Sequence, residues 1–422
     1  MKTLFLIDDN ISNKISFYHL ACFLVALPFD LFYSQLVIIS FAIHTIIHLQ
    51  ENRLHLLLNK IILIPIAVYI IGLIAICYST DKTEGLNIAG RQTAIFFIPV
   101  LLALNQLNLN KYKFQLLKIF AFTCTIVTVY LYADAIHTLF YFHLPVSTLF
   151  TTAFINHNFS LPIELHATYF AMYTALSLFI FLLSALQEKL NHKKILYGFC
   201  CSILFAGIIQ LTSRAVFAAI IIIALLGISI FLFQGKKRIG FLVASILIIS
   251  ITFFIITKVD AFKLRYVSEL KNDLTQTAIN DEVLEPRVVR WELAWSLIKV
   301  SPVIGYGNGS EKELLKQLYF QNKLYISYLE EFNVHSQYLS FLLRAGIIGL
   351  TVYIIAVFFG FSIAVQKNDF LFFAFMLLIA IVSLSENILD VNKGIFFYSF
   401  FLSFFLIANN TEIFYAGNRK TY

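Results

Sequence analysis

The chain has 422 residues, of which 59% are hydrophobic and 13% are charged, and its mean hydropathy is +0.82. An average soluble domain carries roughly 25% charged residues, so this composition excludes a soluble globular protein. Apolar runs of about 18 or more residues recur along the chain, and each can cross about 30 Å of hydrocarbon as a helix. Because these runs show no alternation of polar and apolar residues, they also exclude a barrel of transmembrane strands.

The sequence predicts an all-α, polytopic integral membrane protein with about 12 transmembrane helices. Residues 1–257 hold helices 1 to 9, residues 258–335 form one long loop, and residues 336–422 hold helices 10 to 12 and a tail. The first and fourth spans are short, which favours a tilted or re-entrant arrangement there. In chain order the expected spans are 15–29, 31–49, 61–78, 91–104, 115–137, 166–186, 195–211, 215–233, 239–257, 336–365, 370–385 and 394–409.

The positive charges predict the orientation of these spans. Short loops on the side of the N-terminus carry about 16 Lys and Arg residues, and those on the other side carry about 4. Both termini are therefore expected in the cytoplasm, with residues 258–335 on the outer face. The net charge of +7 comes from clusters at span ends, so no nucleic-acid partner is expected. Residues 1–14 contain acids and no small-residue cleavage site, so no removable signal peptide is expected.

No metal or cofactor is expected. The five cysteines lie in expected spans without CxxC spacing and are interpreted as small apolar residues. His44 and His48 are four residues apart, but no further ligand type accompanies them on the same span. The absence of a GxGxxG or Walker loop argues against a nucleotide-sugar donor and against ATP-driven transport.

The long loop carries helical signals. Pro286 precedes RVVRWELAWSLIKV, whose Trp and Ala residues recur at helical spacing, and Ser301-Pro302 ends that pattern. A flexible GYGNG turn follows, and then a second amphipathic segment, EKELLKQLYFQNKLYISYL. We therefore expect amphipathic helices in this loop. A second outer loop, residues 138–165, is apolar and aromatic and is expected to lie in the membrane interface beside the first.

Four arginines lie where the outer face would meet an anionic headgroup. Arg214 lies in a short turn between two spans, Arg287 and Arg290 are three residues apart on the first loop helix, and Arg91 opens the fourth span. A guanidinium group is always protonated and presents a planar set of donors that suits phosphate oxygens. The alternative is that these arginines anchor the spans or pair with nearby acids, namely Glu84, Glu285 and Glu292.

His335 stands at the start of the tenth span, in HSQYL followed by GIIG. Together with the upstream RxxRWxxAW…PxxGYGNG stretch and the Ser-Arg pair at residue 214, this order of motifs resembles the O-antigen ligase and polymerase family of bacterial envelope proteins. The resemblance covers the architecture broadly and residues 287–350 most specifically.

The resemblance implies a metal-independent glycosyltransferase in the bacterial inner membrane, with its active site facing the periplasm. Its partners would be an undecaprenyl diphosphate-linked glycan donor, an acceptor glycolipid and the lipid bilayer. By resemblance, Arg214 and Arg290 hold the donor diphosphate, with Arg287 as an alternative for the second arginine, and His335 acts on the acceptor hydroxyl.

Residue chemistry agrees with these roles. Arginines neutralise the charge that develops on a diphosphate leaving group, and the unperturbed pKa of a histidine side chain suits a proton acceptor. Glu386 is the reserve candidate for the base, and it is also the expected partner of Arg344, which lies inside the tenth span. His166 and Tyr169, in ELHATYF, are candidates for sugar or headgroup contact.

Two other functions stay open. A polymerase that joins lipid-linked repeat units of O-antigen or exopolysaccharide needs the same diphosphate and hydroxyl sites as a ligase. A transporter or flippase of lipid-linked glycans is less favoured, because it should show broken helices near the membrane midplane and repeat symmetry between its halves.

Overall fold

The computed structural model describes residues 2–274 and 285–415. Within these ranges every regular element is a helix. Helix ends follow local sequence signals: the side chain of Asn108 accepts from the N–H groups of Asn110 and Lys111 where α7 (Leu109–Tyr141) begins. The expectation of an all-α polytopic membrane protein is confirmed.

Seven helical stretches in the described part of the chain are long and apolar enough to cross a membrane, or eight if one bent pair counts as a span. The bent pair is η1 (Glu51–Leu58) with α4 (Lys60–Ile76), at 62°. The expected count of about 12 is not confirmed. The seven are α5 with α6 (Lys82–Leu104), α7, α9 (Ala167–Gln187), α10 (Asn191–Leu211), α11 to α12 (Arg214–Phe231), α13 (Gly235–Lys258) and α19 (Gln337–Gln366).

In the described part of the chain, three apolar helices are shorter than these spans: α3 (Leu31–Ile47), α20 (Phe370–Val382) and α21 (Asn392–Ala408). The helix α2 (Ile11–Ala26) is also too short to count among the spans. The fourth expected span, 91–104, begins earlier than predicted: α5 opens at Lys82, where Asp81 accepts from the N–H of Glu84. The polar residues of α5 hid this extension from a search for apolar runs.

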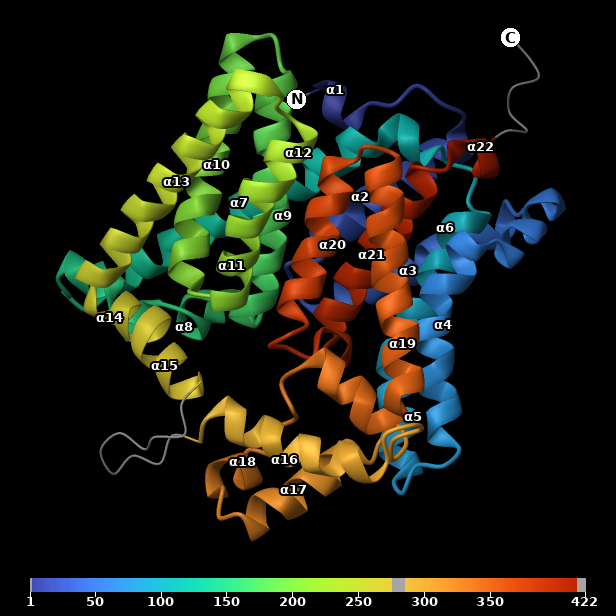
Figure 1. Cartoon of the computed structure of the whole chain (residues 1–422). Helices are drawn as coiled ribbons and strands as arrows, with labels where there is room; N and C mark the ends of the chain where they lie inside the picture. The colour runs from blue at the N-terminus through green and yellow to red at the C-terminus, as the bar shows by residue number, and fades with distance from the viewer. Residues whose placement is uncertain (1, 275–284, 416–422) are drawn as a thin grey trace.

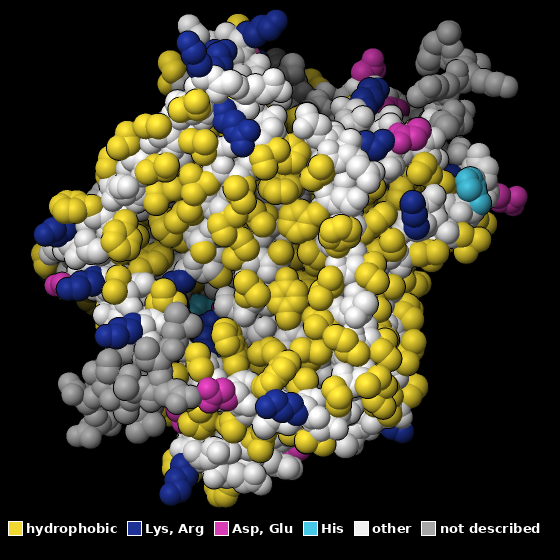
Figure 2. Space-filling view, viewed as in Figure 1, with side chains coloured by type: hydrophobic (Ala, Val, Ile, Leu, Met, Phe, Trp, Pro, Cys, Tyr) yellow, Lys and Arg dark blue, Asp and Glu magenta, His cyan; other side chains and the backbone are white. Residues whose placement is uncertain are grey.

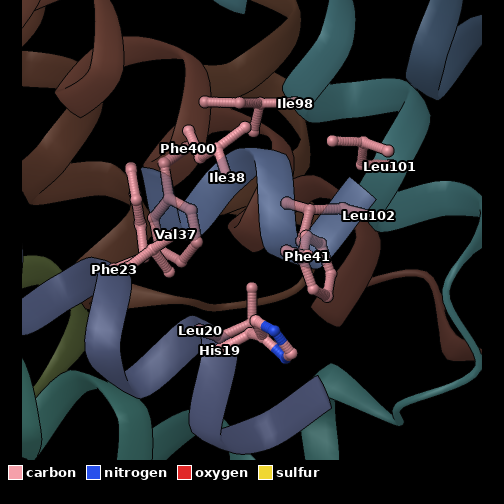
Figure 3. Close-up of a pocket in the computed structure, with 10 residues that line it drawn as sticks. All are labelled: His19, Leu20, Phe23, Val37, Ile38, Phe41, Ile98, Leu101, Leu102 and Phe400. Carbon is pink, nitrogen blue, oxygen red and sulfur yellow. The ribbon is translucent and has the colours of Figure 1, made fainter. Parts of the chain in front are cut away.

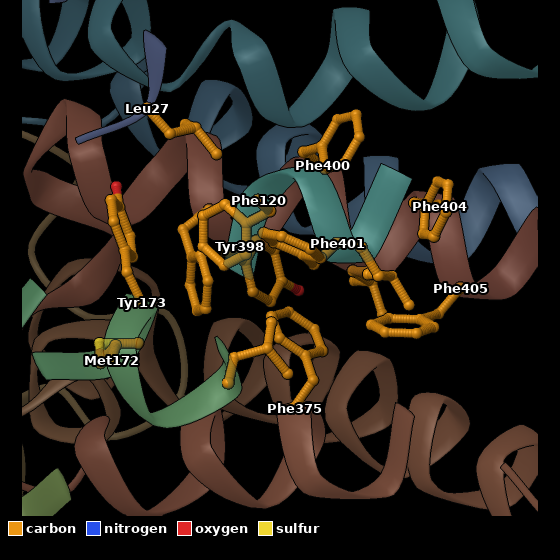
Figure 4. Packing of buried hydrophobic residues seen from close by; sticks show 14 of the residues in the cluster. Leu27, Phe120, Met172, Tyr173, Phe375, Tyr398, Phe400, Phe401, Phe404 and Phe405 are labelled. Atoms are coloured by element: carbon orange, nitrogen blue, oxygen red, sulfur yellow. The ribbon is translucent and has the colours of Figure 1, made fainter. Parts of the chain in front are cut away.

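The core of the bundle surrounds α21. Every residue from Gly394 to Ala408 is buried, so this helix contacts protein on all sides. Its phenylalanines pack against one another and against Phe120 and Phe375 from α7 and α20, as Figure 4 shows for part of the cluster. By contrast, α13 exposes large apolar side chains along its length. Figure 2 shows hydrophobic side chains across the middle of one face, as expected for a lipid-facing surface.

The long loop folds into a cap at one end of the bundle. After α13 the chain continues through α14 (Asp260–Lys263), the π-helical turn Leu264–Ser268 and α15 (Glu269–Leu274). The cap proper consists of α16 (Arg287–Val300), α17 (Glu311–Gln321) and α18 (Tyr325–Leu329). These helices share a small core, and Figure 1 shows them at the end of the bundle opposite α1 (Lys2–Phe5) and α22 (Thr411–Phe414).

The GYGNG turn attaches this cap to the bundle. A Cβ added to Gly307 would lie 2.3 Å from the Cα of Ser79, and one added to Gly309 would lie 2.2 Å from the carbonyl oxygen of Asp81. Both glycines also have positive φ angles, which side chains disfavour. The turn is therefore a close backbone contact with the α4–α5 junction, not a flexible linker.

Two cysteine variants test the topology, one in the cap and one at the end of α19 far from the cap. We expect Gln321→Cys, on the exposed end of α17, to react with a membrane-impermeant thiol reagent in intact spheroplasts, because the positive-inside rule puts the cap outside. Gln366→Cys, at the far end of α19, should react only after lysis. Both variants need a background without the five native cysteines. The reverse labelling pattern would contradict the orientation.

Candidate active site

The polar residues that the motifs point to gather where the cap meets the bundle. Arg214 begins α11 after Ser213, and the preceding Thr212, with a φ of 47°, ends α10 in a left-handed turn. Arg287 and Arg290 lie on the first turn of α16. His335 precedes α19, and Glu386 lies in the connection between α20 and α21.

Asp273 on α15 lies between two of the arginines. Its Oδ2 is 2.5 Å from Nη2 of Arg214 and 3.7 Å from Nε of Arg287. One carboxylate therefore contacts two guanidinium groups, so Arg214 and Arg287 face the same small volume. Two cations that share one anion are arranged to bind a group with several negative oxygens.

Glu386 lies between Arg287 and His335. Its Oε1 is 3.9 Å from Nη2 of Arg287, and its Oε2 is 3.9 Å from Nδ1 of His335. Burial raises the pKa of the Glu386 carboxyl, but the neighbouring His335 and Arg287 outweigh this effect and hold it below its ordinary value. Glu386 is therefore a carboxylate at neutral pH. Arg287 is fixed further by donating from Nη1 to the carbonyl oxygen of Ser385 at 3.0 Å.

His335 is held in an uncommon backbone conformation. Its φ is 49°, and its N–H donates to Oδ1 of Asn333 at 2.9 Å. Its ring meets Phe332 edge to face, with centroids 5.6 Å apart, and its side chain is 27% exposed. A non-glycine residue at positive φ persists only where the surrounding structure fixes it, and such positions cluster at functional sites. The imidazole is thus positioned but still accessible.

Arg290 is more deeply buried than its neighbour Arg287. Its guanidinium lies over the ring of Phe332 at 5.0 Å, and its Nε and Nη1 have no hydrogen-bond partner among the described residues. Nη1 of Arg214 is buried and unpartnered in the same way. Buried donors without acceptors are costly, and they remain available to an anionic ligand.

Two histidines border this region. The rings of His157 and His166 lie 4.1 Å apart, and both are close enough to the charge of Glu386 to respond to it. Tyr169 lies deeper: it is buried, and its hydroxyl donates to the carbonyl oxygen of Asn387 at 3.4 Å. Tyr169 therefore supports the connection that carries Glu386, and a contact of its side chain with substrate stays a prediction.

The segment from α10 to α19 is similar to a known protein family. Residues 199–354 match the O-antigen ligase family. The match begins in α10 and ends in α19, so this O-antigen ligase domain contains Arg214, Asp273, Arg287, Arg290 and His335. The resemblance inferred from the motifs is confirmed. A search of curated proteins gave no match.

The O-antigen ligase domain and the apolar helices together indicate a multi-pass inner-membrane protein with a ligase or polymerase type of function. Lipid-linked glycans are the substrates that this function suggests. Among the described residues, no group of three or more His, Cys, Asp or Glu side chains is placed to hold a metal ion.

Arg91 lies apart from the other arginines. It is exposed on α5 and pairs with Glu84 at 3.1 Å, as the alternative interpretation of this residue supposed. It borders a separate groove between α3, α6 and α21. The apolar pocket in Figure 3 is also separate from the candidate active site and contains none of its residues. The pocket is lined by His19, Leu20, Phe23, Val37, Ile38, Phe41, Ile98, Leu101, Leu102 and Phe400.

The expected pairing of Arg344 with Glu386 is wrong. Arg344 donates to both carboxylate oxygens of Asp390 at 2.7 Å and to Oε2 of Glu311 at 2.6 Å. Glu386 instead faces Arg287 and His335. The prediction failed because Glu311, at the start of α17, reaches Arg344 only through the folding of the cap, which no sequence spacing reveals.

Gln337, in the HSQYL motif, connects α19 to the segment that carries Glu386. Its N–H donates to the carbonyl oxygen of Ser383 at 2.9 Å, and its Oε1 accepts from the N–H of Leu389 at 2.8 Å. Together with the Arg344–Asp390 pair, these bonds hold residues 383–390 against the start of α19. The distance between His335 and Glu386 therefore depends on a buried polar network that sequence reasoning did not predict.

Breaking this network should destabilise the protein strongly. We expect Arg344→Gln to lower the free energy of unfolding by about 3–5 kcal/mol, because Glu311 and Asp390 would remain buried without their cation. Lys367→Gln is the matched control, because Lys367 is the C-cap of the same helix. This substitution removes a surface ion pair with Glu412, which should cost at most about 1 kcal/mol. Thermal unfolding in detergent measures both variants. Equal shifts in Tm would contradict the role assigned to Arg344.

Proposed function

We propose that the protein is an O-antigen ligase-like glycosyltransferase, which moves a glycan from undecaprenyl diphosphate to an acceptor sugar of the lipid A–core type. The reaction would take place on the periplasmic face of the inner membrane and would need no metal. The observation that carries this proposal is the cluster of three arginines, two of them with unpartnered buried N–H groups, beside a histidine–carboxylate pair.

The arginines supply the donor site in this proposal. Arg214 and Arg290 hold the diphosphate through their unpartnered donors, and Arg287 adds a third positive charge between them and Glu386. When the bond between the sugar and the diphosphate breaks, negative charge grows on the leaving oxygen. Prearranged guanidinium groups stabilise that charge in a partly buried site.

His335 and Glu386 supply the acceptor side. In this proposal Nδ1 of His335, which lies 3.9 Å from Oε2 of Glu386, carries the proton, and Nε2 is the acceptor. The acceptor hydroxyl attacks the anomeric carbon of the donor and gives its proton to Nε2. The electron pair of the broken carbon–oxygen bond leaves with the diphosphate. His335 is thus the general base, and Glu386 orients its ring and stabilises the imidazolium ion.

A deletion strain tests this function. We expect mass spectrometry of its envelope to show an accumulated undecaprenyl diphosphate-linked glycan and the loss of that glycan from the acceptor glycolipid. Restored wild-type protein should reverse both changes, and Arg214→Lys should not. Shortening of the chains to single repeat units would instead identify a polymerase. An unchanged profile of lipid-linked and glycolipid-bound glycans would contradict the proposal.

A further inference from the structure

A polar groove opens beside the ligase site, on the side of α15. Asn156, His157 and Asn158 line one wall, and Arg265 and Glu269 line the other. It encloses about 180 Å³ and also contacts apolar residues, including Ile155 and Leu264. We call it the His157 groove. Of its charged and amide residues, only Arg265 and Glu269 lie within the segment that matches the O-antigen ligase family, whereas Asn156 and Asn158 lie before it.

The groove adjoins the cluster of arginines. The charge of Arg265 is close enough to lower the pKa of His157 and His166, and it also acts on Arg214. The ring of His157 stands between the groove and His166, at 4.1 Å from the latter. A molecule bound at the arginines by its phosphates could therefore extend into the groove past His157.

The histidines present uncharged hydrogen-bonding groups to such a molecule. The N–H of Ala167 donates to Nδ1 of His157 at 3.4 Å, and the N–H of Thr168 donates to Nδ1 of His166 at 3.3 Å. Each ring therefore carries its proton on Nε2. Desolvation of the rings, with the nearby positive charge of Arg265, holds the pKa of both histidines below the ordinary value. Both are neutral donors at physiological pH.

The remaining groups complete a set that suits hydroxyls. Asn158 keeps its amide in place by donating to the carbonyl oxygen of Thr152 at 2.9 Å, and Arg265 pairs with Glu269 while its Nε is buried without a partner among the described residues. Neutral imidazole and amide groups, with one unpartnered guanidinium N–H, match the alternating donors and acceptors of a sugar ring.

We propose that the His157 groove binds sugar units of the donor glycan, next to the diphosphate held by the arginines. This inference rests on the proposed function, because it assigns the glycan part of the same donor. The donor is favoured over the acceptor because Arg265 lines the groove and its charge acts on Arg214, whereas His335 pairs with Glu386 and does not line the groove. His157 and Asn158 are then residues that recognise the glycan and take no part in the chemical step.

The test compares two lipids on the full-length protein in nanodiscs: undecaprenyl diphosphate alone, and the same lipid with the glycan that the deletion strain accumulates. We expect wild-type protein to bind the glycan-bearing lipid about tenfold more tightly, as two neutral hydrogen bonds allow. His157→Ala and Asn158→Ala should each reduce that advantage and leave the affinity for the bare lipid unchanged. His137→Ala, an exposed histidine on α7 outside the groove, is the control and should bind like the wild type.

The outcomes separate the two proposals. If wild-type protein binds neither lipid, the proposed function fails. If it binds both equally, or if the variants keep the full advantage of the glycan, the function survives and the groove assignment is overturned. An advantage that persists while the KM for the acceptor rises in His157→Ala would also overturn the donor assignment.

Discussion

His335→Ala is expected to lower the rate of glycan transfer by a factor of roughly 100 to 10,000, the usual contribution of a positioned general base. Donor binding should stay nearly unchanged, because the arginines and not the imidazole hold the diphosphate. The side chain is 27% exposed and lies 3.9 Å from its partner Glu386, so its removal should leave the protein folded. The expected signature is a loss in kcat with little change in donor affinity.

The measurement is glycan transfer per folded molecule, together with binding of an undecaprenyl diphosphate analogue. Glu386→Gln should lower the rate less than His335→Ala, because it removes the orienting charge and keeps the base. If His335 were only structural, the alanine variant would have lower expression or a lower Tm with unchanged specific activity. Full activity in well-folded His335→Ala would transfer the role of base to Glu386.

Arg214→Lys is expected to lower transfer by roughly 100- to 1,000-fold, close to the effect of Arg214→Ala. A lysine keeps the charge, but an ammonium group cannot replace two parallel N–H donors on a diphosphate. Both donor affinity and kcat should fall, in contrast to His335→Ala, because the arginine contacts the donor before and during bond cleavage. This difference distinguishes the binding role from the proton-transfer role.

Arg91→Lys is the matched control for this substitution. Arg91 lies on the same expected side of the membrane, but its guanidinium pairs with Glu84 in an exposed position outside the cluster. Its replacement should leave transfer within about twofold of wild type, in line with the small energy of exposed ion pairs. Equal losses in the two variants would show that a general positive potential, and not a specific diphosphate contact, explains the effect of Arg214.

Composition and chain order predicted the main features of the fold. The apolar runs identified most of the helices, and Pro286 with Ser301-Pro302 predicted α16 to within one residue of its observed ends. The same local signals placed Arg287 and Arg290 on one helix. Arg214 was recognised because a charge in a short turn between two apolar spans must stay at the membrane surface.

The partners of these residues could not be predicted. Asp273 lies in a polar stretch with no periodicity, and nothing in the sequence indicates that it reaches Arg214. The choice of Asp390 and Glu311 for Arg344, and of His335 for Glu386, depends on how the cap folds onto the bundle. Ion pairs between distant segments are set by tertiary packing, whereas the ends of helices are set by neighbouring residues.

The most direct test of the central claim is a single-turnover reaction of the purified protein with lipid-linked glycan and acceptor. Mass spectrometry would follow the glycosylated acceptor and the free undecaprenyl diphosphate over time. We predict that one undecaprenyl diphosphate is released for each glycan transferred, and that both products appear far more slowly with His335→Ala and Arg214→Lys. Donor that stays intact in the presence of acceptor and wild-type protein would contradict the assignment of these residues to glycan transfer.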